Sequence, residues 1–266
     1  MSNTCLFNSN YFKDKVVLIT GASGGGIGTN VAKNILDLKG TVILNGKNDA
    51  SLKRISNQLN SDYYSANITN LYEVEKMFDY IVSKYGRIDI LINNAAYGGS
   101  NSKLFDIDNF ELEKEISVNF KGALYCSKFA SESMVKQKYG KIIFISSSAA
   151  YRGTHGRNVG YASSKAALHG LTKQLALELG PYNINVNAIC PSQIDTPRIR
   201  KNGRKNDDSL NKHAENLPLG RIGSPQDVSN LLIFLASDAA SYVTGEIIVI
   251  DGGSSLASIT TNIIKA

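Results

Sequence analysis

Short apolar runs alternate with segments of helical periodicity along most of the chain. The runs are rich in β-branched residues, whereas the segments between them repeat apolar residues every three or four positions, as amphipathic helices do. These runs are too uniformly apolar to leave one face in water, so we expect a parallel sheet covered by helices on both sides. The pattern predicts an α/β, doubly wound fold with seven strands, at residues 15–20, 41–45, 63–66, 88–92, 141–146, 185–190 and 246–250.

The segments between the strands predict helices. Asp108 is a suitable N-cap for the longest of them, and Ser224-Pro225 opens a last helix with proline in its first turn. No repeat, low-complexity linker or change of composition divides the chain, so we expect residues 1–266 to form a single domain. One long segment without clear periodicity, at about residues 193–220, predicts a substrate lid. The predicted helices cover residues 27–38, 50–59, 70–85, 108–136 and 160–179.

The composition is that of a globular protein. Hydrophobic residues make up 42% and charged residues 20% of the chain, which argues against disorder and against a coiled coil. The N-terminus lacks the pattern of a secretory signal, and no apolar stretch approaches the ~20 residues needed to span a bilayer. We therefore expect a cytoplasmic protein without a membrane partner. Three scattered cysteines and three histidines, none with ligand spacing, predict neither a disulfide framework nor a metal site.

The formal net charge is +6, which raises the question of a nucleic-acid partner. Most basic residues are interspersed with acidic ones, and no aromatic residues interleave the one dense basic run. We therefore expect no nucleic acid, and interpret the run as a solvated or substrate-facing part of the lid. It contains Arg198, Arg200, Lys201, Arg204 and Lys205.

A glycine-rich turn, T-G-A-S-G-G-G-I-G at residues 20–28, lies between the first predicted strand and the first helix. Without a β-carbon the backbone of such a turn can approach a pyrophosphate, whose charge the helix N-terminus favours. Glycine-rich turns are common, but this position in an alternating pattern indicates a dinucleotide site of the Rossmann type.

The end of the second strand indicates which dinucleotide is bound. An acidic residue there usually bonds the ribose of NAD, whereas a basic one accepts the 2′-phosphate of NADP. The chain reads L-N-G-K-N at residues 44–48, with no carboxylate, so Lys47 favours NADP(H) over NAD(H). The alternative is that Lys47 is an ordinary solvated lysine.

Tyr161 and Lys165 are four residues apart at the start of a predicted helix. This spacing places the phenol and the ammonium on one helical face. A cation beside the phenol, together with a cationic nicotinamide ring, favours the phenolate and so suits a general acid/base. Alone the spacing is often coincidental, but it follows a glycine turn and the run Ser146-Ser147-Ser148.

From about residue 15 to residue 253 the chain resembles the classical short-chain dehydrogenase/reductase family. The resemblance rests on several motifs in the family's order. These are Thr20-Gly21 with Gly26-Ile27-Gly28, Asn93-Asn94-Ala95-Ala96, Asn119, Ser146-Ser147-Ser148, Tyr161 to Lys165, Cys190-Pro191, Thr196-Pro197, and Thr244-Gly245 with Asp251-Gly252-Gly253.

The resemblance implies a catalytic set of four residues. Tyr161 would exchange a proton with the substrate oxygen, and Lys165 would favour its ionisation and hold the nicotinamide ribose. Asn119 would help to anchor a proton-relay water. The serine that binds the substrate carbonyl maps best to Ser147, with Ser148 as the alternative.

The resemblance also implies cofactor contacts and an assembly. Asn67 and Ile68 would contact adenine, Asn94 would lie by the adenosine ribose, and Ile194 and Thr196 would lie beside the nicotinamide amide. The family's members suggest a homotetramer or dimer joined through the helices that contain Asn119 and Tyr161. The phosphates would be bound by Gly21, Ser23, Gly26, Ile27 and Gly28.

Three departures from the family pattern affect the cofactor site. The glycine turn carries one extra residue, so which of Ser23, Gly24 and Gly25 faces the phosphates is open. Ala96 and Ser192 stand where the family usually has glycine. None of these departures removes a catalytic group.

We therefore expect an NADP(H)-dependent oxidoreductase that transfers a hydride between nicotinamide and a carbonyl or secondary alcohol. One alternative is a 3-oxoacyl-(acyl-carrier-protein) reductase-like activity on an anionic thioester, attracted by the basic lid. Another is a cofactor-binding scaffold or sensor without catalysis, which the presence of all four catalytic residues disfavours.

Overall fold

The computed structural model describes residues 10–99, 101–153, 158–200 and 207–256. Its centre is a seven-stranded sheet in the order β3-β2-β1-β4-β5-β6-β7, and every pair of neighbours is parallel. The predicted strands are confirmed, with ends that differ by one or two residues. They are β1 (Val16–Ile19), β2 (Thr41–Gly46), β3 (Asp62–Ser65), β4 (Ile90–Asn93), β5 (Gly140–Ile145), β6 (Ile184–Pro191) and β7 (Ile247–Ile250).

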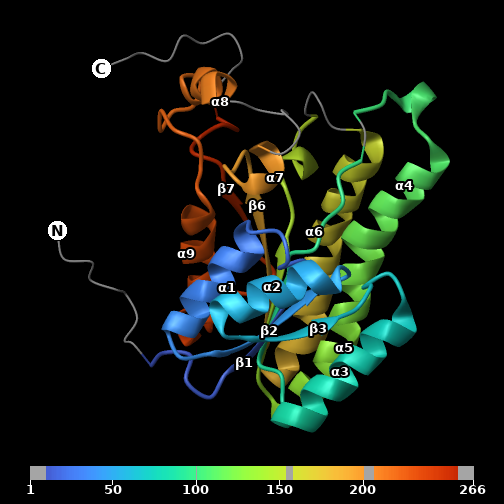
Figure 1. The fold of residues 1–266 in the computed structure, drawn as a ribbon, viewed down its shortest axis with the longest axis vertical. Helices are drawn as coiled ribbons and strands as arrows, with labels where there is room; N and C mark the ends of the chain where they lie inside the picture. Colours follow the sequence, from blue (N-terminus) through green and yellow to red (C-terminus); the bar gives the residue numbers. More distant parts are fainter. Residues whose placement is uncertain (1–9, 100, 154–157, 201–206, 257–266) are drawn as a thin grey trace, which may run out of the picture.

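Helices cover both faces of this sheet (Figure 1). One apolar cluster lies under α1, α2 and α9, and a second lies under α3, α5 and α6. Because both faces are covered, the inner strands are buried on both sides and need apolar residues at every position. The predicted doubly wound fold is confirmed. The helices are α1 (Ile27–Asp37), α2 (Asp49–Leu59), α3 (Leu71–Tyr85), α5 (Gly122–Gln137), α6 (Val159–Leu179) and α9 (Pro225–Ala236).

The strand order reverses between β1 and β4. The chain moves outward from β1 to β3 and then returns to the other side of β1. The loops that leave the carboxyl ends of β1 and β4 therefore diverge and open a crevice, which is where ligands bind in such sheets.

The long helix expected from Asp108 is divided in the structure. Asp108 does cap α4 (Asn109–Ile116), accepting a hydrogen bond from the Phe110 N–H at 3.1 Å. A wide π-helical turn, Ser117–Lys121, then separates α4 from α5. Such turns are frequent at functional sites, and this one contains Asn119.

The expected lid contains two short helices, α7 (Pro197–Arg200) and α8 (Asp207–Ala214). With four and eight residues, they are too short to give a clear apolar period. The Arg200 guanidinium joins them, because it binds Asp195 at 2.6 Å and Asp207 at 2.7 Å. Lys201, Arg204 and Lys205 of the basic run lie outside the described residues.

Within the described ranges, no helix is both long and apolar enough to cross a membrane. The same part of the chain holds no group of three or more histidine, cysteine or acidic residues placed to bind a metal ion. Cys126 and Cys190 are buried free thiols.

Candidate active site

A cavity of about 1090 Å³ opens at the carboxyl ends of the strands, above the switch point between β1 and β4. It extends from the end of β2 past the glycine turn to the start of α6. Of the residues predicted to be catalytic or to bind the cofactor, Asn119 is the one that does not line it. The cavity brings together Gly21, Ser23, Gly26, Ile27, Gly28, Lys47, Asn67, Ile68, Asn94, Ser147, Tyr161, Lys165, Ile194 and Thr196.

Two positions of the glycine turn exclude a side chain. Gly21 has a φ of +66°, and a β-carbon there would lie 2.5 Å from the Cα of Ala95. A β-carbon on Gly28 would lie 2.6 Å from Nδ2 of Asn94, which donates to the carbonyl oxygens of Thr20 and Gly21. The turn therefore packs tightly on the loop after β4, and the bare backbone faces the cavity.

The structure shows how the turn accommodates its extra residue. Ser23 and Gly24 line the cavity, whereas Gly25 lies outside it with a φ of +71°. The Gly25 N–H donates to Oγ1 of Thr29 at 3.1 Å. Helix α1 begins after Gly26 without a side-chain cap, so the N-terminus of an 11-residue helix meets the cavity. A bare turn at a helix N-terminus fits the pyrophosphate of a dinucleotide.

The end of the cavity that is expected to hold adenosine is lined by Lys47, Asn67 and Ile68. Lys47 is exposed and follows β2 directly. Asn45 beside it is buried, and its Oδ1 has no hydrogen-bond partner. Among the described residues that line the whole cavity, Glu113 on α4 is the single carboxylate. The described lining residues at the end of β2 therefore include a cation and no carboxylate.

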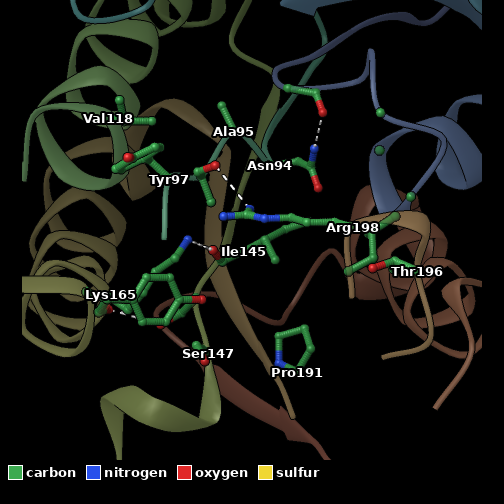
Figure 2. Close-up of a pocket in the computed structure, with 18 of the residues that line it drawn as sticks. Asn94, Ala95, Tyr97, Val118, Ile145, Ser147, Lys165, Pro191, Thr196 and Arg198 are labelled. Atoms are coloured by element: carbon green, nitrogen blue, oxygen red, sulfur yellow. Dashed lines mark hydrogen bonds between the residues drawn. The ribbon is translucent and has the colours of Figure 1, made fainter. Parts of the chain in front are cut away.

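Tyr161 and Lys165 are placed by the first turns of α6. The Asn158 side chain caps this helix by accepting a hydrogen bond from the Tyr161 N–H at 2.9 Å. Lys165 follows one turn later and is buried, with an exposed fraction of 2%. Its Nζ donates to the Ile145 carbonyl oxygen at 2.6 Å (Figure 2). Burial, with a smaller contribution from the positive charge of Arg198, lowers the pKa of Lys165 to about 7.

The three serines after β5 have different surroundings. Ser146 is buried, and its hydroxyl donates to the Lys165 carbonyl oxygen at 2.9 Å and contacts Nε2 of His169 at 3.0 Å. All three serines line the cavity, but the Ser146 hydroxyl is already engaged by these two partners. The Ser147 Oγ also accepts a hydrogen bond from the Ala149 N–H at 3.2 Å. This geometry leaves Ser147 and Ser148 as the candidates for binding a substrate oxygen.

Asn119 is buried behind the cavity wall rather than in it. Its Oδ1 accepts a hydrogen bond from the Tyr97 N–H at 2.7 Å. Its Nδ2 donates to the Tyr97 carbonyl oxygen at 2.9 Å and to the Ser164 hydroxyl at 3.0 Å. The side chain thus joins the loop after β4 to α6, so it fixes the wall beside Tyr161.

The two residues predicted to lie beside nicotinamide, Ile194 and Thr196, are at the start of the segment expected to form the lid. Ile194 is buried and pairs with Gly223 in an isolated parallel bridge. Thr196 lies against the glycine turn, because a β-carbon on Gly26 would stand 3.6 Å from its Cγ2. The predicted pair of Ile194 and Thr196 therefore lies on the same cavity as the turn.

Sequence reasoning named Asn119 but missed the rest of a row of polar side chains that runs along α4 into the π-turn. Glu111, Glu115 and Asn119 recur every four residues and all bind the loop after β4. The Tyr97 hydroxyl donates to Glu111 at 2.7 Å, and the Gly99 N–H donates to Glu115 at 2.7 Å. A polar period of four on a helix face that should pack on the protein is a signal that could have indicated this row.

The fold and the cavity together define a dinucleotide-binding oxidoreductase of the Rossmann type. A family model described as enoyl-(acyl carrier protein) reductase matches residues 21–255. The chain belongs to the short-chain dehydrogenase/reductase family, whose oxidoreductases act on CH–OH and carbonyl groups with nicotinamide cofactors.

The relatives that match this chain are named for different substrates. A 3-oxoacyl-(acyl-carrier-protein) reductase of Rickettsia felis is 37% identical, covering 90% of this chain and 96% of the relative. A 3α-hydroxysteroid dehydrogenase of Mediterraneibacter gnavus is 35% identical, with coverages of 91% and 97%. Among solved structures, the aldohexose dehydrogenase of Thermoplasma acidophilum has a TM-score of 0.85 at 32% identity, with coverages of 96% and 99%.

Proposed function

We propose that this family member uses NADP(H) to transfer a hydride between nicotinamide and a carbonyl or secondary alcohol. The observation that carries the proposal is the convergence of the glycine turn, Ser147, Tyr161 and Lys165 on one cavity. Family membership gives the reaction class, and the cavity supplies a candidate for each group that the reaction needs. One unbroken space allows cofactor and substrate to meet at Tyr161.

The choice of NADP(H) rests on Lys47. It is the one basic residue lining the cavity at the end of β2, and the described lining residues there include no carboxylate. A lysine ammonium binds phosphate oxygens through charge-assisted hydrogen bonds. NAD(H) is the less favoured cofactor, because its ribose would find no acidic partner there.

Tyr161 moves the proton in the proposed mechanism. In the reductive direction its phenol donates a proton to the oxygen of the carbonyl, and in the oxidative direction its phenolate accepts one from the alcohol. The hydroxyl of Ser147 donates to the same substrate oxygen and orients the carbonyl. When bound, the nicotinamide ring supplies or accepts the hydride.

Lys165 stabilises the ionised form of Tyr161 from the next turn of α6. It is held by the Ile145 carbonyl oxygen at 2.6 Å, so its ammonium is already fixed within the cavity. A fixed cation stabilises developing negative charge without a cost of reorganisation. Asn119 does not line the cavity and acts indirectly, because its side chain fixes Tyr97 and Ser164.

A second candidate is the reduction of 3-oxoacyl thioesters on an acyl carrier protein. Two observations favour it: several relatives have this name, and the described residues that line the cavity include five lysines or arginines and one carboxylate. A cationic mouth raises the local concentration of an anionic substrate. No activity on such thioesters would contradict this candidate, and activity that does not weaken with added salt would contradict the attraction by the cationic residues.

A spectrophotometric assay of NADPH consumption tests the proposed function. The panel contains a 3-oxoacyl thioester, a steroid ketone, an aldose and a simple diketone. Turnover with at least one carbonyl, and none with Tyr161→Phe, is the expected result. Tight NADPH binding without turnover on any member would favour the non-catalytic scaffold.

The assembly and the location complete the proposal. We expect a homotetramer or homodimer in the cytoplasm, on the basis of family resemblance and of the absence of a membrane-spanning helix among the described residues. Light scattering on a size-exclusion column measures the assembly directly.

A further inference from the structure

Arg198 spans the cavity between its two walls. Its backbone belongs to α7, on the side of the glycine turn. Its Nη1 donates to the Ala96 carbonyl oxygen at 3.2 Å, on the loop after β4 (Figure 2). Its positive charge also contributes to lowering the pKa of Lys165. The guanidinium therefore lies beside the catalytic end of the cavity.

The backbone of Arg198 starts from the glycine turn. A β-carbon placed on Gly25 would lie 3.6 Å from Cγ of Pro197, and one on Gly26 would lie 3.6 Å from Cγ2 of Thr196. The two residues before Arg198 thus contact the two glycines that lead into α1. The Arg198 side chain therefore starts beside the place where this turn would bind an anion.

Arg200 holds this short helix in place. It binds both carboxylate oxygens of Asp195, at 2.6 and 2.7 Å, and Asp207 at 2.7 Å. Its positive charge is therefore already matched by carboxylates. The Arg198 guanidinium reaches instead to the backbone carbonyl oxygen of Ala96. Of the two arginines, Arg198 is the one that lines the cavity.

Figure 2 shows the Arg198 guanidinium between the loop after β4 and Lys165, so a dinucleotide that reaches from the glycine turn to Tyr161 would meet it. Arg198 must then move, and the nearest strong anion is the pyrophosphate beside its own backbone. A guanidinium is a planar fork of donors that matches phosphate oxygens in pairs.

We propose that Arg198 binds the pyrophosphate of the dinucleotide cofactor and lies across the nicotinamide site only when that cofactor is absent. This inference rests on the proposed function, because it requires a nicotinamide dinucleotide in the cavity. It adds a side-chain cation to a pyrophosphate site otherwise made of backbone N–H groups. Arg198 thereby couples arrival of the cofactor to the clearing of the space in front of Lys165.

Calorimetric titration of the full chain tests the inference with three ligands. NADPH has both the pyrophosphate and the 2′-phosphate, ADP-ribose has only the pyrophosphate, and adenosine 2′-monophosphate has only the 2′-phosphate. The variants are Arg198→Ala, Arg198→Lys and, as a control for loss of one surface charge, Lys128→Ala on α5. Lys128 is exposed and does not line the cavity.

Arg198→Ala should raise the Kd of NADPH and of ADP-ribose by the same factor, about tenfold, the usual effect of losing a charge-assisted hydrogen bond. The Kd of adenosine 2′-monophosphate should stay within twofold of the wild-type value. Arg198→Lys should recover part of the loss, because it keeps the charge and loses the fork. Lys128→Ala should match the wild type with all three ligands.

Three results would overturn the inference. Unchanged or tighter binding of ADP-ribose by Arg198→Ala would show that the arginine only blocks the site. Equal losses with adenosine 2′-monophosphate would show a general disturbance. Unchanged Kd values with a raised KM for an anionic carbonyl would assign Arg198 to the substrate. Failure of the wild type itself to bind NADPH or NADH would instead contradict the proposed function.

Discussion

The ammonium of Lys165 lies 2.6 Å from the carbonyl oxygen of Ile145, at the end of β5. The ammonium is thus held in the cavity from a helix on one side and a strand on the other. Burial and the nearby Arg198 lower its pKa to about 7, so near neutral pH this lysine is divided between its charged and neutral forms. Any ligand that prefers the charged form must draw a proton into the site.

Cofactor affinity should therefore depend on pH. An anionic ligand binds more tightly when Lys165 is charged. The charged form predominates below the pKa of about 7 and is lost as the pH rises above it. The affinity for ADP-ribose, whose pyrophosphate does not titrate there, should be constant below neutrality and fall above it, by at most about tenfold per pH unit. Calorimetry across the neutral range measures this.

Titratable groups other than Lys165 also lie at or near the cavity, among them His213 and Cys190. The control for this titration is therefore Lys165→Met, which removes the lysine charge and keeps those two residues. The variant should bind more weakly below neutrality and show a flat profile. A wild-type profile as flat as that of Lys165→Met would contradict the assigned charge change.

Lys47 should set the preference between the two nicotinamide dinucleotides. Replacing it with alanine removes a charge-assisted contact to the 2′-phosphate, so the ratio of kcat/KM for NADPH to that for NADH should fall about tenfold. Lys53→Ala on α2 is the matched control, since Lys53 is exposed and outside the cavity. If NADH already matches or exceeds NADPH in the wild type, the NADP(H) assignment is wrong.

Glu115 should position Tyr161 through the cap of α6. It is fully buried, and its Oε1 accepts from the Gly99 N–H at 2.7 Å and from Nδ2 of Asn158 at 3.2 Å. Asn158 in turn caps α6 at Tyr161. Glu115→Ala should lower kcat about tenfold, the scale expected when a catalytic group is slightly misplaced, while the Kd of NADPH stays within twofold.

Glu115→Gln keeps an acceptor at Oε1 and should recover most of the lost kcat. Glu132→Ala, at an exposed glutamate of α5, should match the wild type. A Glu115→Ala variant with lowered Tm but unchanged kcat would show that the residue supports only the fold.

Asp62 should stabilise the edge of the sheet. It accepts hydrogen bonds of 2.7 Å from Tyr80, Lys84 and Tyr85 on α3. Burial alone would raise the pKa of Asp62, but the hydrogen bonds from Lys84, Tyr85 and Tyr80 outweigh it and lower the pKa to about 2. Asp62→Asn should reduce the free energy of unfolding by about 1–2 kcal/mol at neutral pH, allowing for partial exposure.

The pH dependence of this loss follows from the lowered pKa. The carboxylate's contribution is present above the unfolded value, near 4, and disappears as the pH falls towards about 2. Thermal melts of wild type and Asp62→Asn should therefore converge in acid. Asp79→Asn, at an exposed aspartate paired with Lys76, should change stability by less than about 0.5 kcal/mol at any pH. Melts that differ equally at all pH values would contradict the account.

The sheet and the placement of Tyr161 could be predicted because both depend on local pattern. Apolar runs that are buried on two faces leave little choice other than inner parallel strands. A spacing of four within a helix likewise fixes which side chains share a face. The glycine turn was recognisable for the same reason, since Gly21 has a positive φ that few other residues adopt.

Other features depend on contacts between distant segments. The π-turn at residues 117–121 interrupts a continuous helical pattern, and Asn119 faces Tyr97 and Ser164 rather than the cavity. The position of the Arg198 side chain depends on the shape of the cavity, which no local pattern reports. The short helices α7 and α8 are shorter than the window over which a helical period can be read.

The most direct test of the central claim is the comparison of wild type with Tyr161→Phe on a carbonyl substrate found in the panel. The substitution removes one hydroxyl and keeps the ring. We expect kcat to fall by at least about a hundredfold, the contribution of a general acid/base, while the Kd of NADPH stays within twofold of the wild-type value. A Tyr161→Phe enzyme that keeps a substantial fraction of the wild-type kcat would contradict the account.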